Sequence, residues 1–389
     1  MNNTASPVRN ILIVEPAWGG SAHFPFNLGL LRACLGAFPL AQIQLLGDST
    51  QQTAMQPYLT QEDKLRSRFE AWPVHADADT LPKDVFKRWR ALRRHAATAI
   101  HDADVIILSS LTASTLNAVR LCGLRPSQKL LLVLHGNLND LGAWRSRNPL
   151  RKALDFEAAL RRSLRPSTRV IALEEHIVSA AKTHAPFLAD YMRHLPHPRL
   201  REEESPLMNR RRTPIKIGFA GLCTIAKGYR QFLDFAALLD ERLPGKFECH
   251  AIGFLHKETW ALDARHLARP PAETPLSRDD FLVSMQDMDL LFFWPHGDYY
   301  RHASSGVFYD ALNKGLPLLT SSEAVSQQPA LARISICAKS LEQLVETCQS
   351  LSAETGQEQL TILKSEIERL RLSSSDSAIA ECLREITYF

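Results

Sequence analysis

Short apolar runs alternate with longer helical patterns from one end of the chain to the other. In the first half, the apolar runs are residues 11–14, 105–108, 130–134 and 170–173, and each is followed by polar or small residues. After the first run, Leu28, Leu31 and Leu35 have the three-to-four spacing of a helix. This alternation predicts strand–helix–strand units and a parallel sheet covered on both faces.

The alternation is interrupted once, between residues 196 and 214. This segment has four prolines, the acidic run 202–204 and the basic run 210–212, so it is predicted to be a linker. Apolar runs then resume at 215–220, 248–252, 290–294 and 318–319, and the chain is helical from Leu341 onward. We therefore predict an α/β protein with a first domain at 1–195, a linker at 196–214, a second domain at 215–370 and a C-terminal helix at 371–389 that crosses back to the first domain. Two such domains would face a cleft, where a ligand is expected.

Composition narrows the class of protein further. The 389 residues are 45% hydrophobic, enough for two cores, and the net charge of +4 gives no reason to expect nucleic-acid binding. The seven cysteines are scattered, which argues against a zinc site or disulfide framework and fits a reducing cytoplasm. The N-terminus is unlike a signal peptide, and no apolar run approaches the roughly 20 residues that span a bilayer. We expect a cytoplasmic protein that is at most attached to the inner face of a membrane.

The most informative segment is 289–321. Its apolar strand ends at Pro295, a polar loop follows, and Ser304, Ser305 and Gly306 open a short helical pattern that stops at Gly315. The free N–H groups at such a helix start favour an anion. We predict that the chemistry lies near residues 304–310.

A second turn with small residues, 221–228, follows the run 215–220 and precedes a helix at 229–239. Small residues let the backbone approach a phosphate, and Lys227 adds a positive charge at the helix start. The segment is not a P-loop, because it lacks the Gly-Lys-Ser/Thr ending. An ordinary strand-to-helix turn with a surface lysine fits the local pattern equally well.

Two side chains are candidates with simpler alternatives. Asp310 lies one turn beyond Gly306, where its carboxylate could bind ribose hydroxyls, although a solvated Asp on an exposed face is the slightly favoured interpretation. His135 follows the apolar run 130–134 at the carboxyl edge of the predicted first sheet. An isolated histidine is more often structural than catalytic.

Two basic clusters in the first domain are interleaved with Trp89, Trp144 and several leucines. They comprise Lys87, Arg88, Arg90, Arg93, Arg94 and His95, and then Arg145, Arg147, Arg151, Lys152, Arg161, Arg162 and Arg165. A basic helix with apolar spacing suits an anionic membrane or a lipid-diphosphate acceptor. Solvated helices whose arginine stems cover the core are the preferred interpretation.

Taken together, these motifs resemble the GT-B glycosyltransferases, and most closely the retaining family four, whose patterns are G-R-x-x-x-x-K-G and E-x7-E-A-x-x-x-G-x-P. Gly221, Lys227 and Gly228 match the first pattern. Asp310, Ala311, Gly315 and Pro317 match the second. Gly19, Gly20 and His135 occupy positions that the family uses near the donor sugar. The likeness covers most of residues 10–320 and is better in the second domain than in the first.

The resemblance implies two Rossmann-like parallel-sheet domains and a donor site. Lys227 and the backbone of Ser305 and Gly306 would hold the diphosphate, Asp310 the ribose, and His135 would lie by the sugar. Two positions depart from the family: its arginine is Leu222 here, and its first acid is His302. Arg301 is the expected substitute for the missing cation. The complete expected site contains Gly19, Gly20, His135, Gly221, Lys227, Arg301, His302, Ser304, Ser305, Gly306 and Asp310.

The implied activity is transfer of a sugar from a nucleotide-sugar to a glycan, lipid-linked or protein acceptor, with retained configuration and with neither a metal nor another cofactor. Synthesis of surface polysaccharide or glycoconjugate is the expected context. The acceptor proton would pass to His135 or, preferably, to the departing phosphate. Leu222 and His302 support an alternative, a non-catalytic GT-B-like protein that binds sugar or a partner. A nucleotide-sugar epimerase is a third hypothesis, but no acid–base pair suited to it is found in the sequence.

Overall fold

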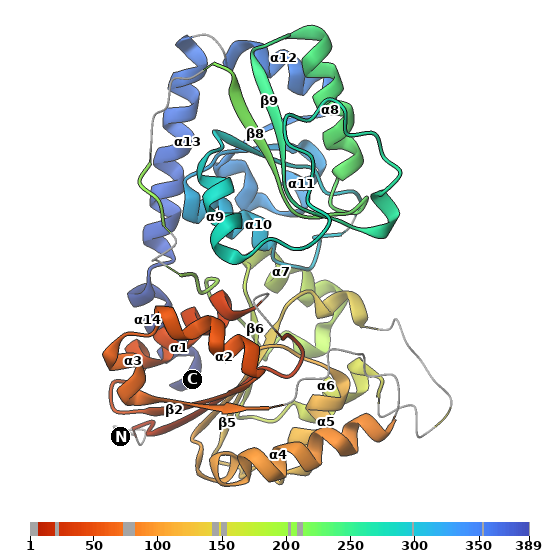
Figure 1. Ribbon diagram of the computed structural model, residues 1–389. Helices are drawn as coiled ribbons and strands as arrows, with labels where there is room; N and C mark the ends of the chain where they lie inside the picture. The colour runs from red at the N-terminus through yellow and green to blue at the C-terminus, as the bar shows by residue number, and fades with distance from the viewer. Residues whose placement is uncertain are drawn as a thin grey trace. The chain divides into compact units, whose positions relative to one another are not determined.

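The chain divides into two compact units, each built around one parallel sheet (Figure 1). The computed structural model describes residues 7–19, 23–72, 82–141, 148, 154–200, 204–207, 213–297, 299–351 and 354–388. The first unit comprises Met1–Leu200, His302–Ser304 and Ser374–Phe389, and the second comprises Arg201–Arg301 and Ser305–Ser373.

The first unit contains a seven-stranded sheet in the order β3-β2-β1-β4-β5-β6-β7, with every pairing parallel. Its strands are β1 (Asn10–Val14), β2 (Gln42–Gly47), β3 (Ser67–Ala71), β4 (Val105–Leu108), β5 (Lys129–Leu134), β6 (Thr168–Ala172) and β7 (Met192–His194). The four strands predicted from apolar runs are confirmed. The sequence analysis missed β2, β3 and β7, because β2 contains two glutamines, the edge strand β3 reads SRFEA and β7 is only three residues long.

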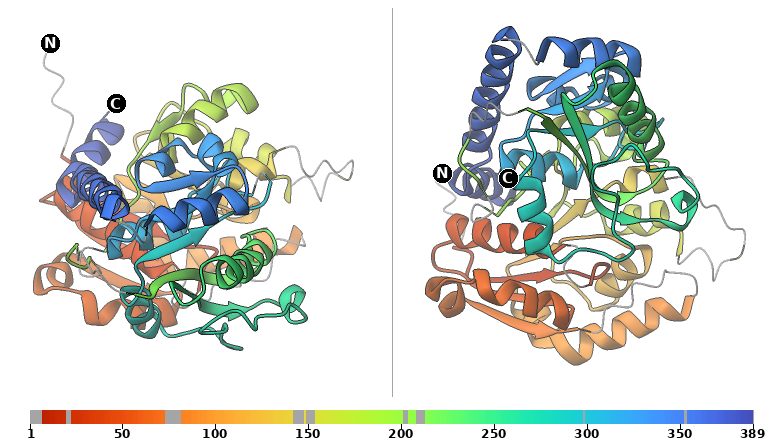
Figure 2. Two further views of the ribbon diagram at one scale, coloured as in Figure 1. Left: turned by 90° about the horizontal axis from the view of Figure 1, so that it is seen from above. Right: turned by 45° about the horizontal axis from the view of Figure 1, so that its top comes forward.

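Helices cover both faces of this sheet. They are α1 (Phe24–Ala37), α2 (Ser49–Met55), α3 (Gln61–Arg66), α4 (Pro82–Asp102), α5 (Ala113–Leu121), α6 (Phe156–Ser163), α7 (Glu175–His184) and α14 (Asp376–Tyr388), with 3₁₀ turns η1 (Gln56–Tyr58), η2 (Asn137–Asp140) and η4 (Pro186–Leu188). Figure 2 shows α1 in red and α4 in orange on opposite faces of the sheet. Side-chain oxygens of Asp48, Thr112 and Asp155 cap the starts of α2, α5 and α6.

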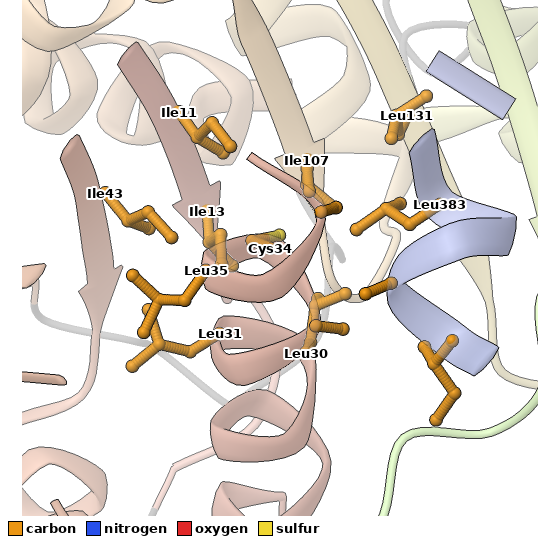
Figure 3. Close-up of a cluster of buried hydrophobic side chains, with 14 of the residues drawn as sticks. Ile11, Ile13, Leu30, Leu31, Cys34, Leu35, Ile43, Ile107, Leu131 and Leu383 are labelled. Carbon is orange, nitrogen blue, oxygen red and sulfur yellow. The ribbon is translucent and has the colours of Figure 1, made fainter. Parts of the chain in front are cut away.

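The alternation of side chains along β1 divides the core of the first unit in two. Ile11 and Ile13 point to the face covered by α1 and α14, while Leu12 and Val14 point to the face covered by α4 and α5. Figure 3 shows Leu383 of α14 pointing toward Ile107 of β4, in the cluster that also contains Leu30 of α1. A helix from the far end of the sequence therefore completes the core of the first unit.

The second unit contains a five-stranded parallel sheet in the order β12-β11-β10-β8-β9. The strands are β8 (Ile215–Cys223), β9 (Phe247–Leu255), β10 (Leu290–Phe293), β11 (Leu318–Ser321) and β12 (Ser335–Ala338). Four were predicted, and β12 was missed. The two parallel sheets confirm the predicted fold class.

The helices of the second unit are α8 (Tyr229–Arg242), α9 (Arg278–Gln286), α10 (Gly306–Lys314), α11 (Ser322–Gln327), α12 (Leu341–Leu351) and α13 (Glu354–Ser373), with 3₁₀ turns η6 (Lys257–Thr259) and η7 (Pro329–Arg333). Gly315 ends α10 in the left-handed region at φ 69°, as the sequence indicates. The buried guanidinium of Arg371 donates to the carbonyls of Leu312 and Asn313, each at 2.8 Å, and to that of Ser205 at 3.1 Å. It thus satisfies carbonyls at the C-terminal end of α10.

The division between the units differs from the predicted boundaries. Pro198, Arg199 and Leu200 are buried in the first unit, so its end lies later than residue 195. Their burial follows from close packing on α1, where a Cβ on Gly29 would lie 3.0 Å from the Arg199 backbone. The returning segment begins at Ser374 rather than at residue 371. Among the described residues, no helix combines the length and apolarity needed to cross a membrane.

Replacing Leu383 by Ala should destabilise the first unit by about 2–4 kcal/mol, because it removes buried apolar atoms between α14, α1 and the sheet. The measurement is chemical denaturation followed by circular dichroism. The matched control is Glu381→Ala on the exposed face of the same helix. Equal stability of the two variants would show that α14 does not complete this core.

Candidate functional site

Gly221 lies inside β8, which corrects the prediction that it belongs to the turn after the strand. Pairing between β8 and β9 continues through Gly221 and Gly253 as far as Cys223 and Leu255. At Gly221 φ is +91°, and a Cβ on Gly253 would lie 1.8 Å from the Gly221 carbonyl oxygen. The two strands therefore approach more closely than side chains allow.

The turn that carries Lys227 comprises residues 224–228 and packs against the end of β10. A Cβ on Gly228, where φ is +87°, would lie 1.9 Å from the Trp294 carbonyl oxygen, so only glycine fits there. The Lys227 N–H donates to the Thr224 hydroxyl at 3.2 Å. The Lys227 side chain folds back over β8, because a Cβ on Gly221 would lie 3.9 Å from its Nζ. Burial lowers the pKa of Lys227 from its ordinary value.

The start of α10 reaches the same point. Val307, the second residue of α10, also lies beside Gly221, because a Cβ added to Gly221 would be 3.9 Å from Val307 Cγ2. Ser305 is the N-cap residue, but its side chain makes no capping hydrogen bond. Among the described residues, no acceptor is found for the N–H groups of Gly306 and Val307. The structure thus brings an ammonium group and an uncapped helix start together at Gly221, an arrangement suited to an anion.

Asp310 is held by an arginine that the sequence analysis did not identify. Arg278 Nη2, at the start of α9, lies 2.7 Å from Asp310 Oδ1, and the two side chains are 19% and 17% exposed. The interpretation of Asp310 as a solvated surface residue is therefore wrong. Its second oxygen, Oδ2, has no hydrogen-bond partner among the described residues and can accept from a ligand hydroxyl.

The loop before α10 is divided between the two units. Arg301 is exposed and belongs to the second unit, as do Ser305 and Gly306, whereas His302 and Ser304 belong to the first. His302 Nδ1 lies 2.8 Å from Asn139 Oδ1. The two predicted donor residues His302 and Ser304 are thus grouped with the first unit rather than with Lys227.

In the first unit, the sequence analysis missed a buried carboxylate directly after β1. Glu15 is fully buried. Six donors surround its two oxygens: the N–H groups of Ala17 at 3.0 Å and Trp18 at 3.1 Å, His23 Nδ1 at 2.6 Å, Asn27 Nδ2 at 3.1 Å, and the hydroxyls of Ser109 at 3.1 Å and Ser110. Burial acts to raise the pKa of Glu15, but the hydrogen bond and positive charge of His23, with the bonds from Ser110 and Ala17, outweigh it and lower the pKa to about 2. An acidic residue immediately after an apolar strand was the available signal.

His23 and His135 lie side by side at the carboxyl edge of this sheet, with ring centroids 4.6 Å apart. His23 Nδ1 donates to Glu15, and no described residue bonds to its other ring nitrogen, Nε2. His135 Nε2 lies 2.8 Å from the Ser109 carbonyl oxygen, to which it must donate. The His135 lone pair is therefore on Nδ1.

His135 is a poor proton acceptor in this setting. Burial, followed by the charges of His23 and His197, lowers its pKa well below the ordinary value. Its neutral ring can accept a hydrogen bond from a ligand hydroxyl. Gly19 lies in the loop between Glu15 and His23, where a Cβ would meet Asp48 at 3.4 Å. Gly20 lies outside the described residues.

The two basic clusters differ in their environment. Arg161 pairs with Glu157 and stacks on Phe187 at 3.5 Å, and Arg165 donates to backbone carbonyls near Arg125. These two residues are structural. In the cluster on α4, Lys87, Arg90, Arg93 and Arg94 are exposed, while Arg88 and His95 are half-buried. Arg145, Arg147, Arg151 and Lys152 lie outside the described residues. In the described part of the chain, no group of three or more His, Cys, Asp or Glu side chains could hold a metal.

Replacing Glu15 by Gln should lower the free energy of unfolding at pH 7 by about 2–4 kcal/mol, because the buried donors lose their charged acceptor. Since the pKa of Glu15 is about 2 in the folded protein against 4.5 ordinarily, its contribution is complete above pH 4.5 and is lost as the pH falls toward 2. Denaturation curves at several pH values measure both effects. Glu62→Gln, at a 75% exposed side chain, is the control and should cost less than about 1 kcal/mol.

The buried histidines should make stability fall between pH 7 and pH 5. Burial lowers the pKa of His197 to about 3 and that of His135 well below 6.5, so only the unfolded chain binds protons in this range. A His197→Gln variant should show a shallower decrease than the parent protein. An equally shallow decrease in a variant of the exposed His296 would contradict this assignment.

The structure resembles those of several solved glycosyltransferases. Sucrose-phosphate synthase from Thermosynechococcus elongatus has a TM-score of 0.67 at 12% identity, over 98% of each chain. Anabaena HepE, solved in complex with UDP and glucose, has a TM-score of 0.63 at 13% identity, over 97% of this chain and 98% of that one. WaaG, a glycosyltransferase involved in lipopolysaccharide biosynthesis, has a TM-score of 0.59 at 14% identity, over 97% and 99%.

No protein-family model matches the chain, and no curated protein matches it. The likeness to solved structures extends over nearly the whole of both chains in each comparison, although the identities are low. This likeness therefore shows the fold and does not identify a substrate. The chain has the GT-B fold of the glycosyltransferases.

Proposed function

We propose that this protein is a glycosyltransferase that moves a sugar from a nucleoside-diphosphate sugar to a hydroxyl group of a glycan, lipid-linked or protein acceptor. The observation that carries the proposal is the convergence of Lys227 and the uncapped start of α10 on Gly221. An ammonium group and free N–H groups at one point suit a diphosphate. The GT-B fold supports the same reading.

In the proposed reaction, the bond between the anomeric carbon and the diphosphate breaks as the bond to the acceptor oxygen forms. Negative charge then grows on the departing diphosphate, where Lys227 and the N–H groups of Gly306 and Val307 would stabilise it. These fixed groups would take the place of a divalent metal. Asp310, oriented by Arg278, would accept hydrogen bonds from the ribose.

We further propose that the configuration of the sugar is retained, as the resemblance to family four implies. In such a reaction the acceptor proton passes to the departing phosphate on the same face. The lowered pKa of His135 supports this route, because a neutral and weakly basic imidazole is a better hydrogen-bonding partner than a general base. Proton magnetic resonance of the product would show retention or inversion directly.

HepE was solved with UDP-glucose, and WaaG acts in lipopolysaccharide biosynthesis. A UDP-sugar is therefore the first donor to test, and surface-polysaccharide synthesis is the proposed context. The proposal includes a cytoplasmic location at the inner face of a membrane. Seven free cysteines fit a reducing compartment.

UDP or GDP should raise the melting temperature of the protein, since a ligand of the folded state stabilises it by mass action. Lys227→Ala should weaken nucleotide binding by about 10- to 100-fold, because a charge-assisted contact is lost. Isothermal titration measures the affinities, and Lys257→Ala at an exposed position is the control. If the two lysine variants bind equally well, the diphosphate is not held at Gly221.

Arg301→Ala tests whether Arg301 supplies the positive charge that the family's arginine provides at the position of Leu222. The expected result is weaker nucleotide binding, and unchanged affinity would remove Arg301 from the proposed site.

A second candidate function is binding of sugar or a partner without catalysis. It is favoured by Leu222 and His302, which stand where the family has an arginine and an acid. Assays of transfer and hydrolysis with UDP- and GDP-sugars separate the two. Nucleotide binding with no turnover of any donor would favour the binding protein, whereas any transfer or hydrolysis would exclude it.

A further inference from the structure

Helix α4 presents a strongly basic face to solvent. Between residues 83 and 94 it carries Lys83, Lys87, Arg88, Arg90, Arg93 and Arg94, against the single acid Asp84. Asp84 lies 4.0 Å from Lys87. The opposite face packs into the core of the first unit through Val85, Leu92, Ala96 and Ile100. Arg88 is half-buried and donates to the Pro16 carbonyl oxygen at 2.6 Å, but the other five cations are exposed. Most of the positive charge on α4 therefore does not serve to hold the helix on its sheet.

Aromatic side chains lie among these cations. Phe86 is 54% exposed, and its ring centroid is 5.1 Å from that of the half-buried Trp89. The Arg90 guanidinium lies 6.0 Å from the Phe86 centroid, and the Arg93 guanidinium lies 5.2 Å from the Trp89 centroid. The two guanidinium groups thus lie over the aromatic rings, and their charges remain at the surface.

The end of α5 extends this apolar surface. Trp89 Nε1 donates to the Leu121 carbonyl oxygen at 3.3 Å, and the Leu121 side chain is 52% exposed. We call Phe86, Trp89, Arg90, Arg93 and Leu121 the α4 patch. Its rings and leucine are anchored to two helices, so they do not need to be ordered when a partner binds.

We propose that the α4 patch docks the first unit on an anionic membrane surface, as a peripheral contact. Charge complementarity selects the partner, because basic side chains attract negatively charged headgroups. The exposed ring and leucine can enter the boundary between headgroups and acyl chains. The docking does not depend on sugar transfer. Under the proposed function, it would bring the protein to an acceptor carried by a lipid.

The contrast with Arg161 and Arg165 supports this choice. Those arginines are engaged by an acid, a ring and backbone carbonyls, whereas the contacts found for Arg90 and Arg93 in the described part of the chain are the two rings. A cation above an aromatic ring keeps its full charge. The charge of Arg161 is offset by the Glu157 carboxylate, and Arg165 is held against the protein backbone, so the α4 patch presents more uncompensated positive charge to solvent.

The experiment is co-sedimentation of the full chain with phosphatidylcholine vesicles, with and without about one-third phosphatidylglycerol. The expected result is binding to the anionic vesicles only, weakened by raising the salt concentration. The double substitution Arg90→Gln and Arg93→Gln should weaken binding at least tenfold, and the double substitution to Lys, which keeps both charges, should preserve most of it.

Phe86→Ser tests the apolar part of the contact and should weaken binding several-fold. Its matched control is Val283→Ser, at a 68% exposed position on α9, which should bind like the parent protein. Because all these positions are exposed or half-buried, circular dichroism should show unchanged folding.

Three outcomes would overturn the proposal: no binding to anionic vesicles, equal binding to neutral vesicles, or full binding by the Gln double variant. Capture of the protein by polyglutamate without any vesicle binding would assign the α4 patch to an acidic protein instead, and would equally overturn it. The Lys227→Ala variant should bind vesicles normally. Failure of docking and failure of nucleotide binding can thus be told apart.

Discussion

The first unit depends on how it accommodates the buried carboxylate of Glu15. A charge without water is strongly unfavourable unless donors surround it, and here they come from three elements: the loop after β1, the start of α1 and the residues after β4. Those elements are held at one edge of the sheet by a single anion. The same arrangement positions two histidines. His23 bonds to Glu15 directly, and His135 bonds to the carbonyl oxygen of Ser109, whose hydroxyl bonds to Glu15.

The second unit solves a different problem, the close approach of backbone segments. Gly253 allows β9 to approach Gly221, and Gly228 allows the turn with Lys227 to lie against β10. Neither approach leaves room for a side chain. One contact joins β9 to β8 and the other sets the turn against the end of β10, and Gly221 lies near both the Lys227 ammonium group and the start of α10. Close packing and an anion site are thus two results of one backbone geometry.

Strands with a continuous apolar run and the α10 unit could be predicted from the sequence because their signals are local. A run such as LLFF and a Ser-Ser-Gly start need no knowledge of distant residues. Strands with a polar sequence such as β3 could not be predicted, since SRFEA forms a strand only by pairing with β2. The same limit applies to the site. Lys227 was visible in its motif, but the partners Glu15–Ser110 and Asp310–Arg278 are brought together only by folding.

Helix α14 has a consequence for how the protein is made. It covers Leu30 and Cys34 of α1, yet it leaves the ribosome only after the whole second unit. While roughly half of the polypeptide is still being translated, the apolar surface of α1 that α14 will cover is exposed in the nascent first unit. During that interval the first unit is expected to bind chaperones that recognise exposed hydrophobic surface. Synthesis, and not only the final structure, thus links the two units.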